Sequence, residues 1–103
     1  MYRRMDSLGR LTLPRKFMDD LAYAPYQPVE IIMEYGKIAI RKFEENEVNV
    51  ARLPKFGIVR KLDVVNRVVI PKEYFYFLGI RSGERQLLNV DLIGNVIYIS
   101  KEE

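Results

Sequence analysis

The chain of 103 residues contains no cysteine and no histidine. Without cysteine it can form no disulfide bond, thiolate metal site or cysteine nucleophile, and without histidine it has no imidazole ligand or histidine general base. It also lacks an apolar run of roughly 18 residues, an apolar signal-peptide core and a glycine-rich phosphate loop. Adjacent carboxylates occur at Asp19-Asp20 and Glu44-Glu45, but sequence neighbours diverge and rarely form an acid/base pair. We therefore expect a soluble cytoplasmic protein that is not an enzyme, needs no cofactor, metal or small-molecule ligand, and does not enter a membrane.

Basic residues concentrate in two stretches of a nearly balanced chain, whose net charge is only +3. The two stretches are copies of one sequence pattern. A shift of 57 residues aligns Arg3 with Arg60, Asp6 with Asp63, Arg10 with Arg67 and Pro14 with Pro71. Farther along, after an extension of about two residues near Ser82-Gly83-Glu84, Ile38 and Ile40 match Ile97 and Ile99.

This alignment predicts two tandem repeats, residues 1–43 and 58–103, joined by a linker of residues 44–57. A unit of this size buries too little surface to be stable alone, so we expect each repeat to require the other. The alternative is a chance similarity between two β-rich halves.

Both repeats predict the same local structure. Short strands are expected at residues 3–8, 11–13, 60–65 and 68–70, a helix at residues 14–21 and 71–78, and a hairpin at residues 29–40 and 88–99. Gly9 and Asn66 occupy the same position between the first two strands, and both residue types tolerate positive φ, which predicts a left-handed turn there. A proline is expected to begin each helix, and Gly79 to end the second, where the first repeat has Ala22.

The second repeat reads Gly57-Ile58-Val59-Arg60-Lys61-Leu62-Asp63, then Asn66-Arg67-Val68-Val69-Ile70-Pro71 and, after the helix, Leu78-Gly79-Ile80. This pattern closely resembles the AbrB/SpoVT-type swapped-hairpin domain of AbrB-like transcriptional regulators, and the first repeat carries the same core from Arg3 to Pro14. The resemblance implies a mainly β fold in which two tandem βββ-type repeats, each with one short helix, interlock into one swapped-hairpin β-barrel. Because both repeats lie in one chain, this barrel would be a pseudo-dimer.

The resemblance also implies double-stranded DNA as the partner, a role in transcription regulation and a location on the nucleoid. A pseudo-twofold axis would gather equivalent basic residues on one face, where they could neutralise phosphates. The predicted DNA-binding residues are Arg3, Arg4, Arg10, Arg15, Lys16, Arg60, Lys61, Arg67 and Lys72, of which the resemblance favours Arg3, Arg10, Arg60 and Arg67. For any single arginine, the alternative is a solvated charge or an ion pair with Asp6 or Asp63.

The helices depart from the pattern of the family. Family members often carry two arginines four and five residues after the proline, where this chain has Met18 and Asp19, or Phe75 and Tyr76. The helix contribution to DNA binding is therefore missing or displaced to other basic residues. Four consecutive aromatics cannot all face one core. In one interpretation Tyr74, Phe77 and Leu78 face the core while Phe75 and Tyr76 cover neighbouring loops. In the other, Phe75 and Tyr76 form an exposed patch for self-association into a homodimer or higher homo-oligomer.

Three other functions stay open. MazE-like antitoxins resemble this fold but carry a C-terminal arm that embraces the toxin, and no such arm is expected after the last predicted strand. MraZ-like proteins with paired repeats are also DNA binders and tend to form rings, so a defined higher oligomer would distinguish them. A protein-interaction barrel with weak or no DNA binding is favoured by the altered helix positions.

Overall fold

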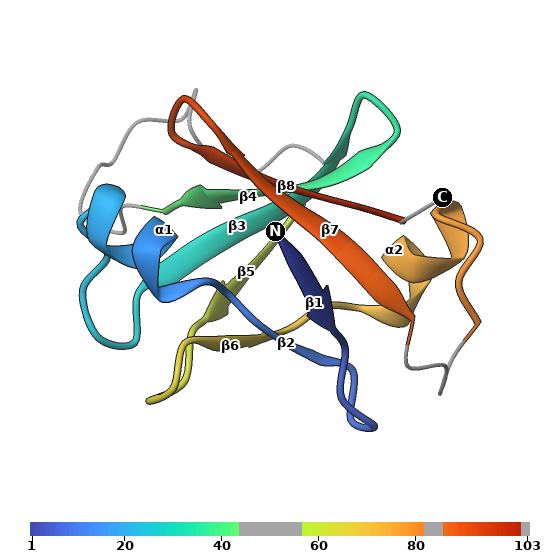
Figure 1. The fold of residues 1–103 in the computed structure, drawn as a ribbon, viewed down its shortest axis with the longest axis horizontal. Coiled ribbons are helices and arrows are strands. Elements are labelled where there is room, and N and C mark those ends of the chain that lie inside the picture. Colours follow the sequence, from blue (N-terminus) through green and yellow to red (C-terminus); the bar gives the residue numbers. More distant parts are fainter. Residues whose placement is uncertain (44–56, 82–85, 102–103) are drawn as a thin grey trace.

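The fold is mainly β with two short helices, as the sequence predicts. The computed structural model describes residues 1–43, 57–81 and 86–101 (Figure 1). In order along the chain its elements are β1 (Tyr2–Arg4), β2 (Arg10–Thr12), α1 (Arg15–Asp20), β3 (Pro28–Glu34), β4 (Lys37–Lys42), β5 (Ile58–Lys61), β6 (Arg67–Val69), α2 (Lys72–Phe77), β7 (Leu87–Ile93) and β8 (Val96–Lys101). In the described residues each repeat thus has four strands, as its local pattern predicts and one more than the βββ-type repeat that the resemblance implies, with one six-residue helix. Neither of these helices is long and apolar enough to span a membrane. The predicted linker, apart from Gly57, lies outside the described residues.

The two repeats exchange their first strands. An antiparallel sheet of six strands has the order β1-β7-β8-β4-β3-β5, so β1 joins the hairpin of the second repeat and β5 joins the hairpin of the first. The registers are equivalent, since Arg3 lies opposite Leu88 in one pair and Arg60 lies opposite Val29 in the other. The hairpins meet through β4 and β8 at the centre of the sheet. The chain therefore has an approximate internal twofold axis, and each repeat completes the sheet of the other.

The described strands do not close into the predicted barrel. β1 and β5 are the two edges of the six-stranded sheet, and β2 and β6 pair with each other as a separate two-stranded sheet. Figure 1 shows this pair crossing the six-stranded sheet on one side. The strands before and after the first turn of each repeat are only three or four residues long. Hydrogen bonds within the two turns occupy backbone groups that longer strands would use to pair. The prediction of a closed β-barrel is therefore wrong for the described residues.

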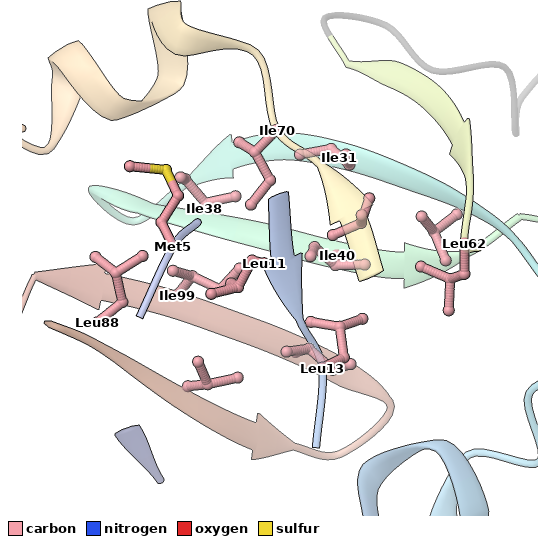
Figure 2. Close-up of a cluster of buried hydrophobic side chains, with 14 of the residues drawn as sticks. Met5, Leu11, Leu13, Ile31, Ile38, Ile40, Leu62, Ile70, Leu88 and Ile99 are labelled. Atoms are coloured by element: carbon pink, nitrogen blue, oxygen red, sulfur yellow. The ribbon is translucent and has the colours of Figure 1, made fainter. Parts of the chain in front are cut away.

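One hydrophobic core serves both repeats. Alternate residues of each hairpin point inward, as predicted, and Ile40 and its equivalent Ile99 are fully buried. Leu11 and Val68 complete the core from β2 and β6, where they lie opposite each other in the register. Figure 2 shows side chains from both hairpins and from β2 and β6 filling the same cluster. Removing either repeat would therefore expose the core of the other.

Both helices end in the same cap. In α1 the backbone amides of Ala22 and Tyr23 donate to carbonyls of the last turn at 3.2 and 3.0 Å, and the equivalent amides of α2 do so at 3.0 and 2.9 Å. This is the Schellman arrangement, which needs a left-handed residue immediately after the helix. Gly79 has φ +77°, as expected for a glycine, but Ala22 adopts φ +53° at the same position. The first repeat therefore holds an alanine in a conformation that suits glycine.

Replacing Ala22 by glycine is expected to raise the free energy of unfolding by about 0.5–1 kcal/mol, because the left-handed region is strained for a residue with a Cβ. Gly79→Ala is the reverse experiment and should lower it by about 1 kcal/mol. A Cβ at Gly79 would have room, since the nearest atom, Lys101 Nζ, lies 3.9 Å away. Urea unfolding curves measure both changes, and a loss of stability in Ala22→Gly would contradict this account.

Candidate nucleic-acid interface

The turn between β1 and β2 is built on one carboxylate. Asp6 Oδ1 accepts hydrogen bonds from the backbone amides of Leu8 and Arg10 at 2.9 and 2.8 Å. Its Oδ2 accepts a third from the Nε of Arg10 at 2.7 Å. Two backbone bonds, from Asp6 to Arg10 and from Gly9 to Asp6, close the turn at 2.9 and 3.1 Å. The aspartate thus ends β1, orders the turn and fixes the arginine at the start of β2.

The turn between β5 and β6 repeats this network bond for bond. Asp63 Oδ1 accepts from Val65 and Arg67 amides at 3.0 and 2.8 Å, and its Oδ2 accepts from Arg67 Nε at 2.6 Å. The left-handed residue is Gly9 in the first turn, with φ +78°, and Asn66 in the second, with φ +62°. The predicted left-handed turn is confirmed at both positions. The alternative proposed for a single arginine, an ion pair with its aspartate, also holds for Arg10 and Arg67.

The two carboxylates stay ionised well below neutral pH. The backbone hydrogen bond from Arg10 is the largest influence on Asp6 and lowers its pKa, more than partial burial raises it. At Asp63 partial burial raises the pKa, but the hydrogen bonds from Arg67 and Val65 together outweigh it, so this pKa is also lowered. A carboxylate whose pKa is lower in the folded state than in the unfolded state stabilises the fold at any pH above its unfolded-state pKa. This contribution is lost as the pH falls through the folded-state pKa. At neutral pH both turns therefore keep their charged form.

The ladder between β2 and β6 brings Arg10 and Arg67 onto one face. Arg10 lies opposite Val69, and Thr12 lies opposite Arg67, while Leu11 and Val68 between them point into the core. Strand alternation therefore directs all four flanking side chains outward. Diagonal neighbours in such a ladder are about 7–8 Å apart, which places the two arginines side by side across the pseudo-twofold axis.

Each of these arginines is anchored but still has donors to offer. In the described part of the chain, Nε is the only guanidinium nitrogen of Arg10 or Arg67 with a hydrogen-bond partner. A guanidinium carries five N–H donors, so each keeps its two terminal amino groups for another partner. The side chains are about one-third exposed, at 30% for Arg10 and 31% for Arg67. The pair is thus a preorganised donor surface.

The other predicted basic residues are spread more widely. Arg3 and Arg60 lie on the edge strands, where their Nη1 atoms donate to the preceding carbonyl of their own strand at 2.8 and 3.2 Å. Arg4 and Lys61 end the same strands and are exposed. The remaining predicted residues, Arg15, Lys16 and Lys72, lie on α1 and α2 at opposite ends of the molecule (Figure 1). The structure therefore brings together Arg10 and Arg67, and places the helix residues apart from them.

The aromatic run of α2 fits neither sequence interpretation fully: Tyr74 and Leu78 pack against the core as the first expects, but Phe77 does not. Phe75 is buried, with 3% of its surface exposed, whereas Phe77 is 74% exposed and Tyr76 58% exposed. Phe75 is the equivalent of Met18, which is also buried, so the repeat is a better guide to this position than helical spacing is. The expectation that Phe75 forms an exposed patch is wrong. The exposed pair is Tyr76 and Phe77.

Sequence reasoning missed the apolar character of the two turns. Leu8 is 69% exposed, Val64 is 74% exposed and Val65 is 52% exposed, all at the tips next to the anchored arginines. Val69 is exposed on the strand between them. Turn tips normally carry glycine, proline, asparagine, aspartate or serine. The signal was present in the sequence, because Leu8 and Val65 align with each other under the repeat.

One polar cluster links the two repeats and has no counterpart at the equivalent described positions. Glu34 accepts hydrogen bonds from Arg41 Nη2 at 2.6 Å and from the Tyr98 hydroxyl at 2.9 Å. The bond from Arg41 is the largest cause of the lowered pKa of Glu34, and the bond to Glu34 is the largest cause of the raised pKa of Tyr98. The positions equivalent to these three residues hold Ile93, Ser100 and Ala39, which cannot form such a cluster. Among the described residues no group of three or more acidic, cysteine or histidine side chains could hold a metal ion.

No protein-family model matches the chain, and no curated protein matches it.

Proposed function

We propose that the protein binds double-stranded DNA, as an AbrB-like transcriptional regulator of the nucleoid, through the face formed by β2, β6 and their two turns. The motif that resembles the AbrB/SpoVT-type domain spans β1, β2 and the turn between them in the first repeat, and β5, β6 and their turn in the second. The exchange of β1 and β5 between the repeats is consistent with the swapped-hairpin pseudo-dimer that the resemblance implies. The closed barrel of that family is not part of the proposal.

One observation carries the proposal: the same aspartate-anchored arginine occurs twice, about one pseudo-twofold axis, on one face. A duplex offers equivalent phosphates and base edges on its two strands, so a twofold protein surface can engage both alike. The terminal amino groups of Arg10 and Arg67 suit phosphate oxygens or the edge of guanine. Arg4 and Lys61 extend the positive charge along the strands that enter the turns. The distant basic residues of the helices would reach only flanking phosphates.

Binding to an AT-rich duplex, followed by fluorescence anisotropy across roughly 50 to 300 mM salt, tests the proposal. We expect the wild type to bind with a steep salt dependence. Replacing both central arginines, in Arg10→Gln/Arg67→Gln, should weaken binding and reduce the slope of log K against log salt by about 0.9 for each phosphate that is no longer neutralised. Glutamine keeps a polar side chain on the turn while removing the charge.

The matched control is Lys37→Gln/Arg81→Gln, which removes the same charge at positions outside β2, β6 and their two turns. It should leave affinity and salt slope near the wild-type values, whereas equal losses in both variants would mean that only net charge matters. Thermal unfolding of each variant shows whether the fold is intact. No binding by the wild type at the lowest salt would reject the proposal. The exposed pair Tyr76 and Phe77 would then favour a protein-interaction module or a self-associating protein.

A further inference from the structure

The tips of the two turns carry exposed apolar side chains beside the basic pair Arg10 and Arg67, and Val69 is exposed on the strand between them. Leu8 of the first turn and Val64 and Val65 of the second together expose most of their side chains. Single exposed apolar residues are common and need no explanation. Here, however, they recur at equivalent turns, project to the same side of the molecule and flank one basic pair (Figure 1). Both turns bear apolar tips, although polar residues would satisfy such turns equally well.

The tips are held rigidly. Each turn is closed by two backbone hydrogen bonds and three bonds to its aspartate. The amide of Leu8 is itself one of the aspartate donors, as is the amide of Val65. A side chain mounted on an ordered turn loses little additional freedom when it is inserted into a partner. The two turns therefore hold their small apolar side chains on an ordered backbone.

We propose that Leu8 and the Val64–Val65 pair act as two wedges that insert between base steps and bend the bound duplex. This inference rests on the DNA binding proposed above. The arginines at the base of the turns would hold the flanking phosphates, while the apolar tips replace part of the stacking contact at one step on each side of the axis. Proteins that insert apolar side chains in this way unstack base steps and bend DNA by roughly 20–90°. Pyrimidine–purine steps such as TA open most readily, so these steps are the expected target.

The test uses an alternating AT duplex in which 2-aminopurine replaces one adenine and a fluorophore pair marks the two ends. The fluorescence of 2-aminopurine rises when the base is unstacked, and energy transfer between the ends rises when the duplex bends. We expect both signals to increase when the wild type binds. The variant Leu8→Ser/Val64→Ser/Val65→Ser should still bind, with the wild-type salt slope because its arginines are intact, and should lose both increases.

The control is Tyr35→Ser/Ile93→Ser, which removes two exposed apolar residues from the tips of the hairpins. Figure 1 shows these hairpins on the opposite side of the molecule from the two turns. This control should bind, unstack and bend DNA as the wild type does. Binding by the wild type without any rise in 2-aminopurine fluorescence would overturn the wedge while leaving DNA binding in place. Loss of unstacking in the control to the same extent would also overturn it, and absence of binding by the wild type would reject DNA binding itself.

Discussion

Leu11→Ala is expected to lower the free energy of unfolding by about 2–5 kcal/mol, a large part of the stability of a domain of this size. The side chain of Leu11 is fully buried, and Figure 2 shows it within the cluster that contains Ile40 and Ile99. It lies opposite Val68 on the pseudo-twofold axis, so its cavity would open at the junction of the two repeats. Few neighbouring atoms can move into such a cavity, because the pairing of β2 with β6 fixes the backbone beside it.

Chemical unfolding followed by circular dichroism measures this loss, with Thr12→Ala as the control. Thr12 is the next residue on β2 but is exposed, and its replacement should change stability by no more than about 0.5 kcal/mol. Because one core serves both repeats, the Leu11→Ala protein should still unfold in a single transition. Two separate transitions, or a loss below about 1 kcal/mol, would show that the repeats do not share their core in the way described.

Gly57→Ala is expected to lower the free energy of unfolding by about 1–3 kcal/mol. Gly57 immediately precedes β5 and passes close to β3. A Cβ at this position would clash with Ile32 Cγ2 and would lie 2.6 Å from the carbonyl oxygen of Ile31. The carbonyl belongs to the strand that pairs with β5, so it cannot yield without disturbing that ladder. The alanine would therefore push β5 away from the edge of the sheet.

Hydrogen exchange locates this damage. In Gly57→Ala, amides of β5 should lose protection more than those of β7 and β8. Gly36→Ala is the matched control: Gly36 has φ +72°, and a Cβ there would meet no atom within 4 Å, so its cost of about 1–2 kcal/mol should arise from backbone strain alone. Unchanged protection of β5 in Gly57→Ala would mean that the crowding at this glycine is relieved without moving the strand.

The internal repeat made much of the local structure predictable. Equivalent residues at Gly9 and Asn66 identified a left-handed turn. The prolines identified the helix starts to within one residue, since Pro14 and Pro71 are the N-cap residues that precede α1 and α2. The same alignment placed Arg10 and Arg67 as partners, and the β2–β6 ladder brings them together. Repeated positions are informative because two different side chains must satisfy one backbone conformation.

Three features were not predictable from local pattern. The first strand of each repeat was expected to run to Leu8 or Val65, but the aspartate side chain captures amides that would otherwise extend the ladder. Closure of a barrel depends on strand lengths and register, which residue types alone do not specify. Burial in α2 was misassigned because a helix of six residues has too few turns for spacing to select one face, so Phe75 and Phe77 exchange their expected roles.

Exchange of strands within one polypeptide has a consequence for how this molecule can change. A dimer of identical chains would have to form by collision, and its stability would depend on concentration. Here both repeats belong to one chain, so their association does not depend on protein concentration. Each substitution also alters only one of the two repeats. The cluster of Glu34, Arg41 and Tyr98 has no counterpart at the equivalent positions, so the two repeats are not identical in their surface chemistry. Because the repeats are joined in one chain, each can change without the other. Substitutions in a single repeat can therefore adapt the protein to an asymmetric binding partner.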